Sequence, residues 1–244
     1  MDYNICAVIP VTSQNNVKIQ IQKALKYKSN FIEYRFDYVK NLKTINRDLL
    51  KNMKDLASSK LSLIFTFRDI TEGGRQNLNL DQKIIAMNEL FKAQPDYIDI
   101  EMNSKNTLLR LINDLAGDNN VKLIFSNHNF KDTKSLKESI NLIKVFEEKL
   151  EELNFNSTIL KNSVFKIIYT ATKFSDNFIP LELCKYYKNQ KKKIISFCMG
   201  DLGIFSRIFC LKAGAFLTYG GTEEISAPGQ IKIEELRKAI DLLV

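Results

Sequence analysis

Short apolar runs and longer segments of helical period alternate along the chain. The runs are rich in Ile, Val, Phe and Tyr and lack strict polar alternation, a composition typical of strands buried on both faces. The predicted strands span Asn4–Ile9, Phe31–Asp37, Leu61–Arg68, Tyr97–Glu101, Val121–Ser126, Val164–Thr170, Lys193–Cys198 and Ala215–Tyr219.

Helices are predicted between these strands, where apolar residues recur every three or four positions. The clearest stripe joins Leu136, Ile140, Ile143, Phe146, Leu150 and Leu153, and a second one occupies residues 233–243. Weaker helical patterns cover Val17–Tyr27, Leu80–Phe91, Thr107–Leu115 and Leu181–Tyr187.

Eight strands that alternate with helices predict an α/β fold, a (β/α)8 TIM barrel formed by residues 1–244 as a single domain. No linker rich in Pro, Gly or Ser interrupts the series. A doubly wound open sheet is the rival architecture. It is disfavoured because no G-x-G-x-x-G motif follows the first predicted strand.

Two polar residues are unusual in this pattern, the single histidine and one lysine. His128 directly follows the predicted strand 121–126, and the active site of a barrel lies at the C-terminal ends of its strands. Lys166 stands inside the apolar run 164–169. Because burying an unpaired ammonium costs several kcal/mol, Lys166 must either pair with a carboxylate such as Asp99 or Glu101, or lose its proton. The neutral amine could attack a ketone and form an imine.

Further polar residues stand at the ends of other predicted strands. Period-two alternation directs Glu33, Arg35 and Asp37 to one face of their strand. Taken singly, such charged residues can be structural ion pairs, glycines can be turn residues, and a histidine can be a satisfied structural group. The other strand-end candidates are Arg68, Glu72-Gly73-Gly74, Asp99, Glu101, Met199, Arg207, Gly220-Gly221, Ser226 and Gln230.

Composition narrows the functional classes. The formal net charge is +8, but the lysines are scattered and no basic stripe is interleaved with exposed aromatic residues, which disfavours nucleic-acid binding. Such a charge can instead attract small anionic substrates. No apolar stretch approaches the ~20 residues of a membrane span, and no signal peptide is recognisable before the first strand.

The four cysteines, Cys6, Cys184, Cys198 and Cys210, show neither C-x-x-C pairing nor a cluster with histidine, which disfavours a zinc site. Three of them lie in apolar surroundings, as expected for reduced, buried thiols. We therefore expect a soluble, cytoplasmic protein without a metal.

The strand-end residues, taken together and in order, resemble those of the type I 3-dehydroquinate dehydratase family. Each motif alone is weak, but the series extends over nearly the whole chain and is specific as a set. It comprises Glu33-x-Arg35-x-Asp37, Phe67-Arg68 with Glu72-Gly73-Gly74, Asp99-x-Glu101, Ser126-x-His128-x-Phe130, Lys166, Met199-Gly200 through Ser206-Arg207, and Ser226-Ala227-Pro228-Gly229-Gln230.

The resemblance implies a lyase of the shikimate pathway of aromatic amino acid biosynthesis. Such an enzyme removes water from 3-dehydroquinate to give 3-dehydroshikimate, with neither a metal nor an organic cofactor. Lys166 would form a Schiff base with the ring ketone. His128 would assist carbinolamine formation and then act first as general base and next as general acid, roles suited to an imidazole, while Glu72 would orient it and tune its charge.

The resemblance also implies a substrate-binding set. Arg207 would bind the substrate carboxylate through its planar donor set, and Ser226 and Gln230 would help from a last loop that could close as a lid. Ring hydroxyls would be contacted by Glu33, Arg35 and Arg68, and Met199 would complete the set. Members of this family are commonly homodimers.

The chain departs from the family pattern in two respects. Many members begin with extra strands that cover the bottom of the barrel, whereas here the first predicted strand starts at Asn4, so bottom closure needs another explanation. In addition, Phe197, Asn129 and Tyr219 stand where Met, Asp and Phe are common. These replacements concern the shape of the pocket more than the mechanism.

Two other functions are consistent with the residues alone. A class I aldolase acting on a sugar phosphate would also use a Schiff-base lysine, but it needs a phosphate cradle of backbone N–H groups after the last two strands. Gly220-Gly221 could contribute to one, although Arg207 fits a carboxylate better. A basic barrel that serves as a binding or scaffold protein gives no reason for Lys166 and His128 to converge.

Overall fold

The computed structural model describes residues 3–57, 60–222 and 229–243. Its parallel strands are β1 (Ile5–Pro10), β2 (Phe31–Arg35), β3 (Ser62–Thr66), β4 (Tyr97–Glu101), β5 (Lys122–His128), β6 (Val164–Thr170), β7 (Lys193–Met199) and β8 (Thr218–Gly221). Its helices are α1 (Gln14–Lys26), α2 (Arg47–Ala57), α3 (Leu80–Lys92), α4 (Asn106–Asn119), α5 (Leu136–Glu152), α6 (Ser157–Asn162), α7 (Phe178–Asn189), α8 (Ile204–Ala213) and α9 (Ile233–Leu243). Short 3-10 turns are η1 (Phe36–Tyr38), η2 (Leu42–Thr44), η3 (Ile70–Glu72), η4 (Phe174–Asn177) and η5 (Asp201–Gly203).

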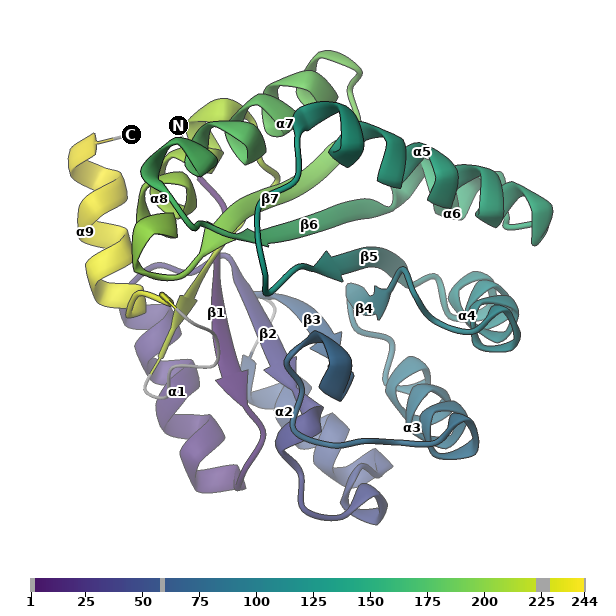
Figure 1. Cartoon of the computed structure of the whole chain (residues 1–244). Coiled ribbons are helices and arrows are strands. Elements are labelled where there is room, and N and C mark those ends of the chain that lie inside the picture. Colours follow the sequence, from purple (N-terminus) through teal and green to yellow (C-terminus); the bar gives the residue numbers. More distant parts are fainter. Residues whose placement is uncertain (1–2, 58–59, 223–228, 244) are drawn as a thin grey trace.

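The strands form one eight-stranded sheet in the order β7-β6-β5-β4-β3-β2-β1-β8, and the helices lie around its outside (Figure 1). The two end strands of the sheet approach each other, because the N–H of Phe216, just before β8, donates to the carbonyl oxygen of Ile194 in β7 at 2.7 Å. The fold is thus a near-closed TIM barrel in a single domain, which confirms the predicted architecture.

The strand residues are mostly buried because helices cover their outer faces and the barrel interior covers the inner ones. All six residues of β1 are buried, for example. Several candidate residues lie differently from the predicted strand bounds. Arg68 follows β3, which ends at Thr66, whereas Met199 is the last residue of β7 and Gly220-Gly221 belong to β8. His128 is the last residue of β5 instead of following the strand, and Asp37 lies in the 3-10 turn η1 after β2.

Three helices were not predicted, α2, α6 and α8, and of these α2 and α8 complete the alternation of strands and helices. The helix α2 packs Leu50, Met53 and Ala57 against the barrel and exposes most of its charged residues, with Lys54 partly buried. The helix α8 begins directly after η5, and its first turns bury Ser206 and Arg207. Arg207 therefore lies beside β7 and β8, the two end strands of the sheet.

Three aromatic rings close the bottom of the barrel, at the N-terminal ends of the strands. Phe31, Tyr97 and Phe216 contact one another pairwise, with ring centroids 5.5 to 6.1 Å apart. Two lysines cap this cluster from outside, since the Nζ atoms of Lys122 and Lys193 lie 5.4 and 5.2 Å from the centroids of Tyr97 and Phe216. Aromatic residues far apart in the sequence therefore close the bottom of the barrel, where many proteins of the similar family have extra N-terminal strands.

Two predictions from composition can be compared with the structure. All four cysteines are buried and free, as expected for reduced thiols. In the part of the chain that is described, no helix is both long and apolar enough to cross a membrane.

Candidate active site

A small cavity at the C-terminal ends of the strands brings most of the predicted site residues together. Its volume is about 50 Å³, which leaves room for only a few water molecules, so side chains must move when a larger ligand enters. Its lining includes seven of the predicted residues, Glu33, Arg35, His128, Lys166, Met199, Arg207 and Gln230. Two others, Arg68 and Glu72, lie behind this lining, and Ser226 is outside the described residues.

Lys166 is buried and paired. Its Nζ donates to Oδ2 of Asp99 at 2.9 Å and lies 3.4 Å from Oε1 of Glu33. Of the two carboxylates considered from the sequence, Asp99 is the partner, while Glu101 binds Arg68. An ammonium is not nucleophilic, so Lys166 must give up a proton before it can attack a ketone.

Arg68 occupies the centre of the charge network beneath the cavity. Its Nη2 donates to Oδ1 of Asp99 at 2.8 Å, and its Nη1 donates to Oε1 of Glu101 at 2.8 Å and to Oγ of Ser126 at 2.7 Å. The adjacent cations Arg68 and Lys166 hold the pKa of Asp99 well below its usual range despite burial. Asp99 therefore stays ionised and links the two cations.

Arg35 and Glu33 are each fixed by a partner from a neighbouring segment. Arg35 makes a two-pronged contact with Asp37, at 2.8 Å through Nε and 2.9 Å through Nη2. Glu33 accepts a hydrogen bond from Oγ1 of Thr66 at 2.8 Å. The interior carboxylates thus pair with cations, and among the described residues no group of three or more His, Cys, Asp or Glu side chains could hold a metal ion.

A tight turn delivers Glu72 to His128. Oε2 of Glu72 lies 2.9 Å from Nδ1 of His128, which leaves Nε2 of the ring outside this contact. The turn requires both of its glycines. Gly73 has a φ of +85°, in the left-handed region, and a Cβ on Gly74 would lie 1.9 Å from the carbonyl oxygen of Arg68. These glycines therefore do more than end a strand, because they set the position of Glu72.

Burial governs the protonation of this pair. Burial raises the pKa of Glu72 to about 8, with Arg68 opposing the rise and Glu101 and Asp99 adding to it. For His128, burial lowers the pKa well below its usual value, and the nearby cations Arg68 and Lys166 lower it further, against Asp99. A buried imidazole that is neutral around pH 7 can accept a proton, as a general base must.

Arg207 differs from the other buried cations because no carboxylate in the described part of the chain pairs with it. Only 2% of its surface is exposed, yet neither Nε nor Nη2 has a hydrogen-bond partner among the described residues. Its Nη1 lies 3.5 Å from the carbonyl oxygen of Tyr219, and burial lowers the pKa of the guanidinium to about 10. Thr218 and Ser206 fix the first turn of α8, so the unpaired donors are held in place beside the cavity.

Two aromatic residues of the site were not predicted to contact the cations. The Nζ of Lys166 lies 4.4 Å from the centroid of the Tyr219 ring, and Cζ of Arg207 lies 4.3 Å from that of Phe197. The period-two alternation of the last two strands was the signal that could have found them, since it directs both rings into the barrel.

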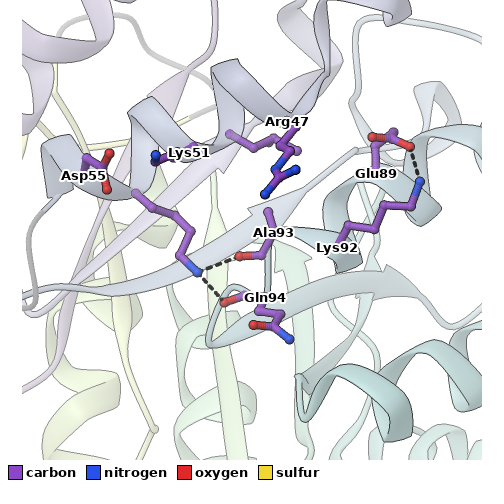
Figure 2. Close-up of a pocket in the computed structure, with 9 residues that line it drawn as sticks. Arg47, Lys51, Asp55, Glu89, Lys92, Ala93 and Gln94 are labelled. Atoms are coloured by element: carbon purple, nitrogen blue, oxygen red, sulfur yellow. Dashed lines mark hydrogen bonds and ion pairs between the residues drawn. The ribbon is translucent and has the colours of Figure 1, made fainter.

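Larger hollows lie outside the barrel interior, and two of them can be compared with the cavity. A groove of about 670 Å³ between the loop after β5 and the helix α5 is also lined by His128, which therefore stands in the wall between groove and cavity. Figure 2 shows another pocket of about 560 Å³, between α2 and α3. There Lys54 donates to the carbonyl oxygens of Ala93 and Gln94, and Lys92 pairs with Glu89. Its lining contains none of the predicted site residues.

Comparison with known proteins identifies relatives along the whole barrel. The profile of the family described as Type I 3-dehydroquinase matches residues 5–244. The 3-dehydroquinate dehydratase of Thermococcus onnurineus is 28% identical over 236 residues, which cover 97% of this chain and 98% of that protein. That of Clostridium botulinum is 29% identical over 245 residues, or 98% and 91% of the two chains.

Solved structures agree with these relatives. A crystal structure of the type I 3-dehydroquinate dehydratase from Clostridium difficile, with covalent modified comenic acid, has a TM-score of 0.81 and 25% identity, and the match covers 99% of this chain and 92% of that one. The 3-dehydroquinate dehydratase structure from Geobacillus kaustophilus has a TM-score of 0.84 at 19% identity, covers 100% of this chain and 91% of that one, and supports the fold alone.

The protonation of His128 can be measured directly, because it is the only histidine among the 244 residues. In a pH titration of untagged protein followed by NMR, we expect its ring resonance to titrate with a midpoint below 6.5, since burial and two cations disfavour the imidazolium. The same resonance in urea-unfolded protein should titrate near ~6.5. A folded-state midpoint at or above the unfolded one would contradict the burial described here.

Proposed function

This chain belongs to the type I 3-dehydroquinase family and is a 3-dehydroquinate dehydratase, a hydro-lyase of the shikimate pathway; from this premise we propose that Lys166, His128 and Glu72 perform its chemistry. The observation that carries the proposal is one cavity lined by a buried lysine, the single histidine and an arginine that no carboxylate of the described residues pairs with. A ketone, an acidic C–H and a carboxylate of one ring substrate would engage these three groups.

Lys166 acts as the nucleophile. After its ammonium proton has left, the amine attacks the ring ketone of 3-dehydroquinate and forms a carbinolamine, which loses water to give a protonated imine. The imine draws electrons from the adjacent carbon and so acidifies its C–H bond. The contacts of Nζ with Asp99 at 2.9 Å and Glu33 at 3.4 Å support this role, because they orient the amine and provide carboxylates beside it.

His128 transfers the protons. Its neutral imidazole removes the proton next to the imine carbon, and the electron pair of that C–H bond moves toward the imine nitrogen as an enamine forms. The imidazolium then protonates the hydroxyl, which departs as water while the enamine's electrons form the new C=C bond and restore the protonated imine. Hydrolysis of the remaining imine releases 3-dehydroshikimate and restores Lys166. The 2.9 Å contact at Nδ1 supports Glu72 as the residue that orients the ring, with Nε2 as the nitrogen that exchanges protons.

Arg207 binds the substrate carboxylate. Two of its three guanidinium nitrogens have no partner among the described residues, and an incoming carboxylate would satisfy the planar donor set while neutralising a buried charge. Gln230, which also lines the cavity, and Ser226, beyond the described residues, would assist.

The other polar residues would define the far side of the substrate pocket. Glu33 and Arg35 line the cavity and would contact ring hydroxyls, whereas Arg68 lies behind the lining and would act chiefly through Asp99 and Glu101. Met199, the last residue of β7, would pack against the ring.

The sugar-phosphate alternative finds little support in the last strand. Gly220 and Gly221 pair with Ala7 and Val8 in the sheet, and the N–H of Gly221 donates to the carbonyl oxygen of Ile231 at 2.9 Å. These glycines therefore belong to β8 and do not form a free cradle for a phosphate. The convergence of Lys166 and His128 on one cavity likewise disfavours a purely scaffolding role.

Homodimer formation is a second part of the proposal. Four phenylalanines at the outer ends of η4, α7 and α8 form an apolar patch, in which Phe174 and Phe178 are 55% and 47% exposed. Phe205 and Phe209 complete it, with neighbouring ring centroids 4.6 to 6.1 Å apart. We propose a second copy of this chain as the occupant, because an apolar patch is self-complementary about a two-fold axis and needs no matching charges on the partner.

The imine can be tested by borohydride reduction. With 3-dehydroquinate and borohydride, mass spectrometry of peptides should find a covalent adduct on Lys166, and Lys166→Met should form none and lose activity on the order of a thousandfold or more. The matched control is Lys144→Met, because Lys144 lies on the exposed side of α5 with 71% of its side chain accessible. An adduct on another lysine, or an active Lys166→Met protein, would refute the proposed nucleophile.

The dimer can be tested by light scattering. The protein should run at twice the chain mass of 28.2 kDa, and Phe178→Lys should reduce it to the single mass, because a charge in the patch opposes burial. Val145→Lys is the control, since Val145 is similarly exposed, at 53%, but lies on α5. A wild-type monomer, or dissociation by the control alone, would exclude this patch as the interface.

A further inference from the structure

Two aromatic rings lie side by side in the wall of the active-site cavity. Phe197 belongs to β7 and Tyr219 to β8, the two strands at the open edge of the sheet, and their ring centroids are 6.3 Å apart. Both residues line the cavity and are almost fully buried, at 3% and 4% exposure. They form one continuous aromatic surface, which we call the ring pair.

Each ring supports one of the two cations that face the substrate. The ammonium of Lys166 lies 4.4 Å from the centroid of Tyr219, and the guanidinium carbon of Arg207 lies 4.3 Å from that of Phe197. Both distances are well within the range for an attractive cation–π contact, which strengthens when water is excluded. The spacing between the two rings therefore sets the spacing between the two cations.

An aromatic ring suits this position because it attracts a cation without neutralising it. A carboxylate beneath Arg207 would pair with the guanidinium and compete with an incoming anion. The ring face of Phe197 leaves Nε and Nη2 unpaired among the described residues. Lys166 already contacts the carboxylates of Asp99 and Glu33, so the Tyr219 ring orients the amine without adding a further charge.

The hydroxyl of Tyr219 has no part in these contacts. It is buried and has no hydrogen-bond partner among the described residues. The ring face, which carries the contact with Lys166, would be retained if this hydroxyl were removed. Substitutions can therefore test the ring face and the hydroxyl of Tyr219 independently.

We propose that the ring pair of Phe197 and Tyr219 is a positioning element that fixes the separation of Lys166 from Arg207 and so selects cyclic oxo acids with the spacing of 3-dehydroquinate, in which one ring carbon lies between the carbons that carry the ketone and the carboxylate. Tyr219 orients the attacking amine, and Phe197 orients the carboxylate-binding guanidinium. This inference rests on the proposed function, because it assigns a substrate group to each cation.

The division of labour predicts opposite kinetic effects for the two residues. Tyr219→Leu should slow formation of the borohydride-trapped Lys166 adduct at saturating 3-dehydroquinate by about tenfold, with KM changed less than about threefold. Phe197→Leu should raise KM by about tenfold and leave the saturated rate of adduct formation within about threefold. A residue with only a packing role would not split KM from the rate in this way.

Conservative variants supply the controls. Tyr219→Phe and Phe197→Tyr keep the ring faces and should restore most of what the leucine variants lose, and unfolding midpoints of all variants would show that the fold persists. Tyr219→Met replaces the leucine variant if that protein is unstable. The ring-pair proposal is overturned if Tyr219→Phe is as slow as Tyr219→Leu, or if both leucine variants change KM and rate together. Absence of a Lys166 adduct in the wild-type protein would instead refute the imine mechanism itself.

Discussion

Asp99 holds together the two cations at the centre of the barrel, and the positions of most other polar side chains follow from that contact. One of its oxygens accepts from Lys166 at 2.9 Å, and the other accepts from Arg68 at 2.8 Å and from Ser126 at 2.6 Å. A carboxylate buried without such partners would be unstable, as would either cation alone. The network therefore fixes the position of Lys166 in the barrel. Through Arg68 it also fixes the position of the Glu101 carboxylate.

Arg207 shows what happens to a buried cation outside this network. It lies in the same interior but contacts a ring face and a carbonyl oxygen in place of a carboxylate. Burial with so little compensation lowers the pKa of its guanidinium to about 10, and a bound carboxylate would reverse that effect. Among the described residues, the barrel thus contains one cation cluster that is neutralised internally and one cation, Arg207, that has no carboxylate partner.

Much of the fold could be predicted from the sequence, because apolar runs buried on both faces mark parallel strands directly. The strands Tyr97–Glu101 and Val164–Thr170 have the predicted bounds. The helix α2 could also have been predicted, since Leu50 and Met53 repeat at helical spacing on its buried side. The helix α8 shows no clear stripe, because apolar residues occur both on its buried side and at the exposed Ile204.

The candidate site was predictable as a set of residues but not as a set of contacts. Asp99 and Glu101 lie on the same face of β4, so alternation alone could not decide which one pairs with Lys166. The contact between Glu72 and His128 depends on the turn at Gly73-Gly74, and the closure of the barrel bottom depends on three rings from distant segments. Such contacts are set by three-dimensional packing, which no local pattern records.

The division of work between Lys166 and His128 is tested most directly by His128→Ala, with borohydride added at successive times after 3-dehydroquinate and the trapped adduct weighed. In the proposed mechanism the imidazole assists carbinolamine formation and moves every proton of the elimination. We therefore predict that the variant forms the imine slowly and that its adduct retains the hydroxyl, so that its mass stays one water above that of the product-derived adduct. A product-derived adduct that appears at the wild-type rate would contradict the assignment of His128 as the base.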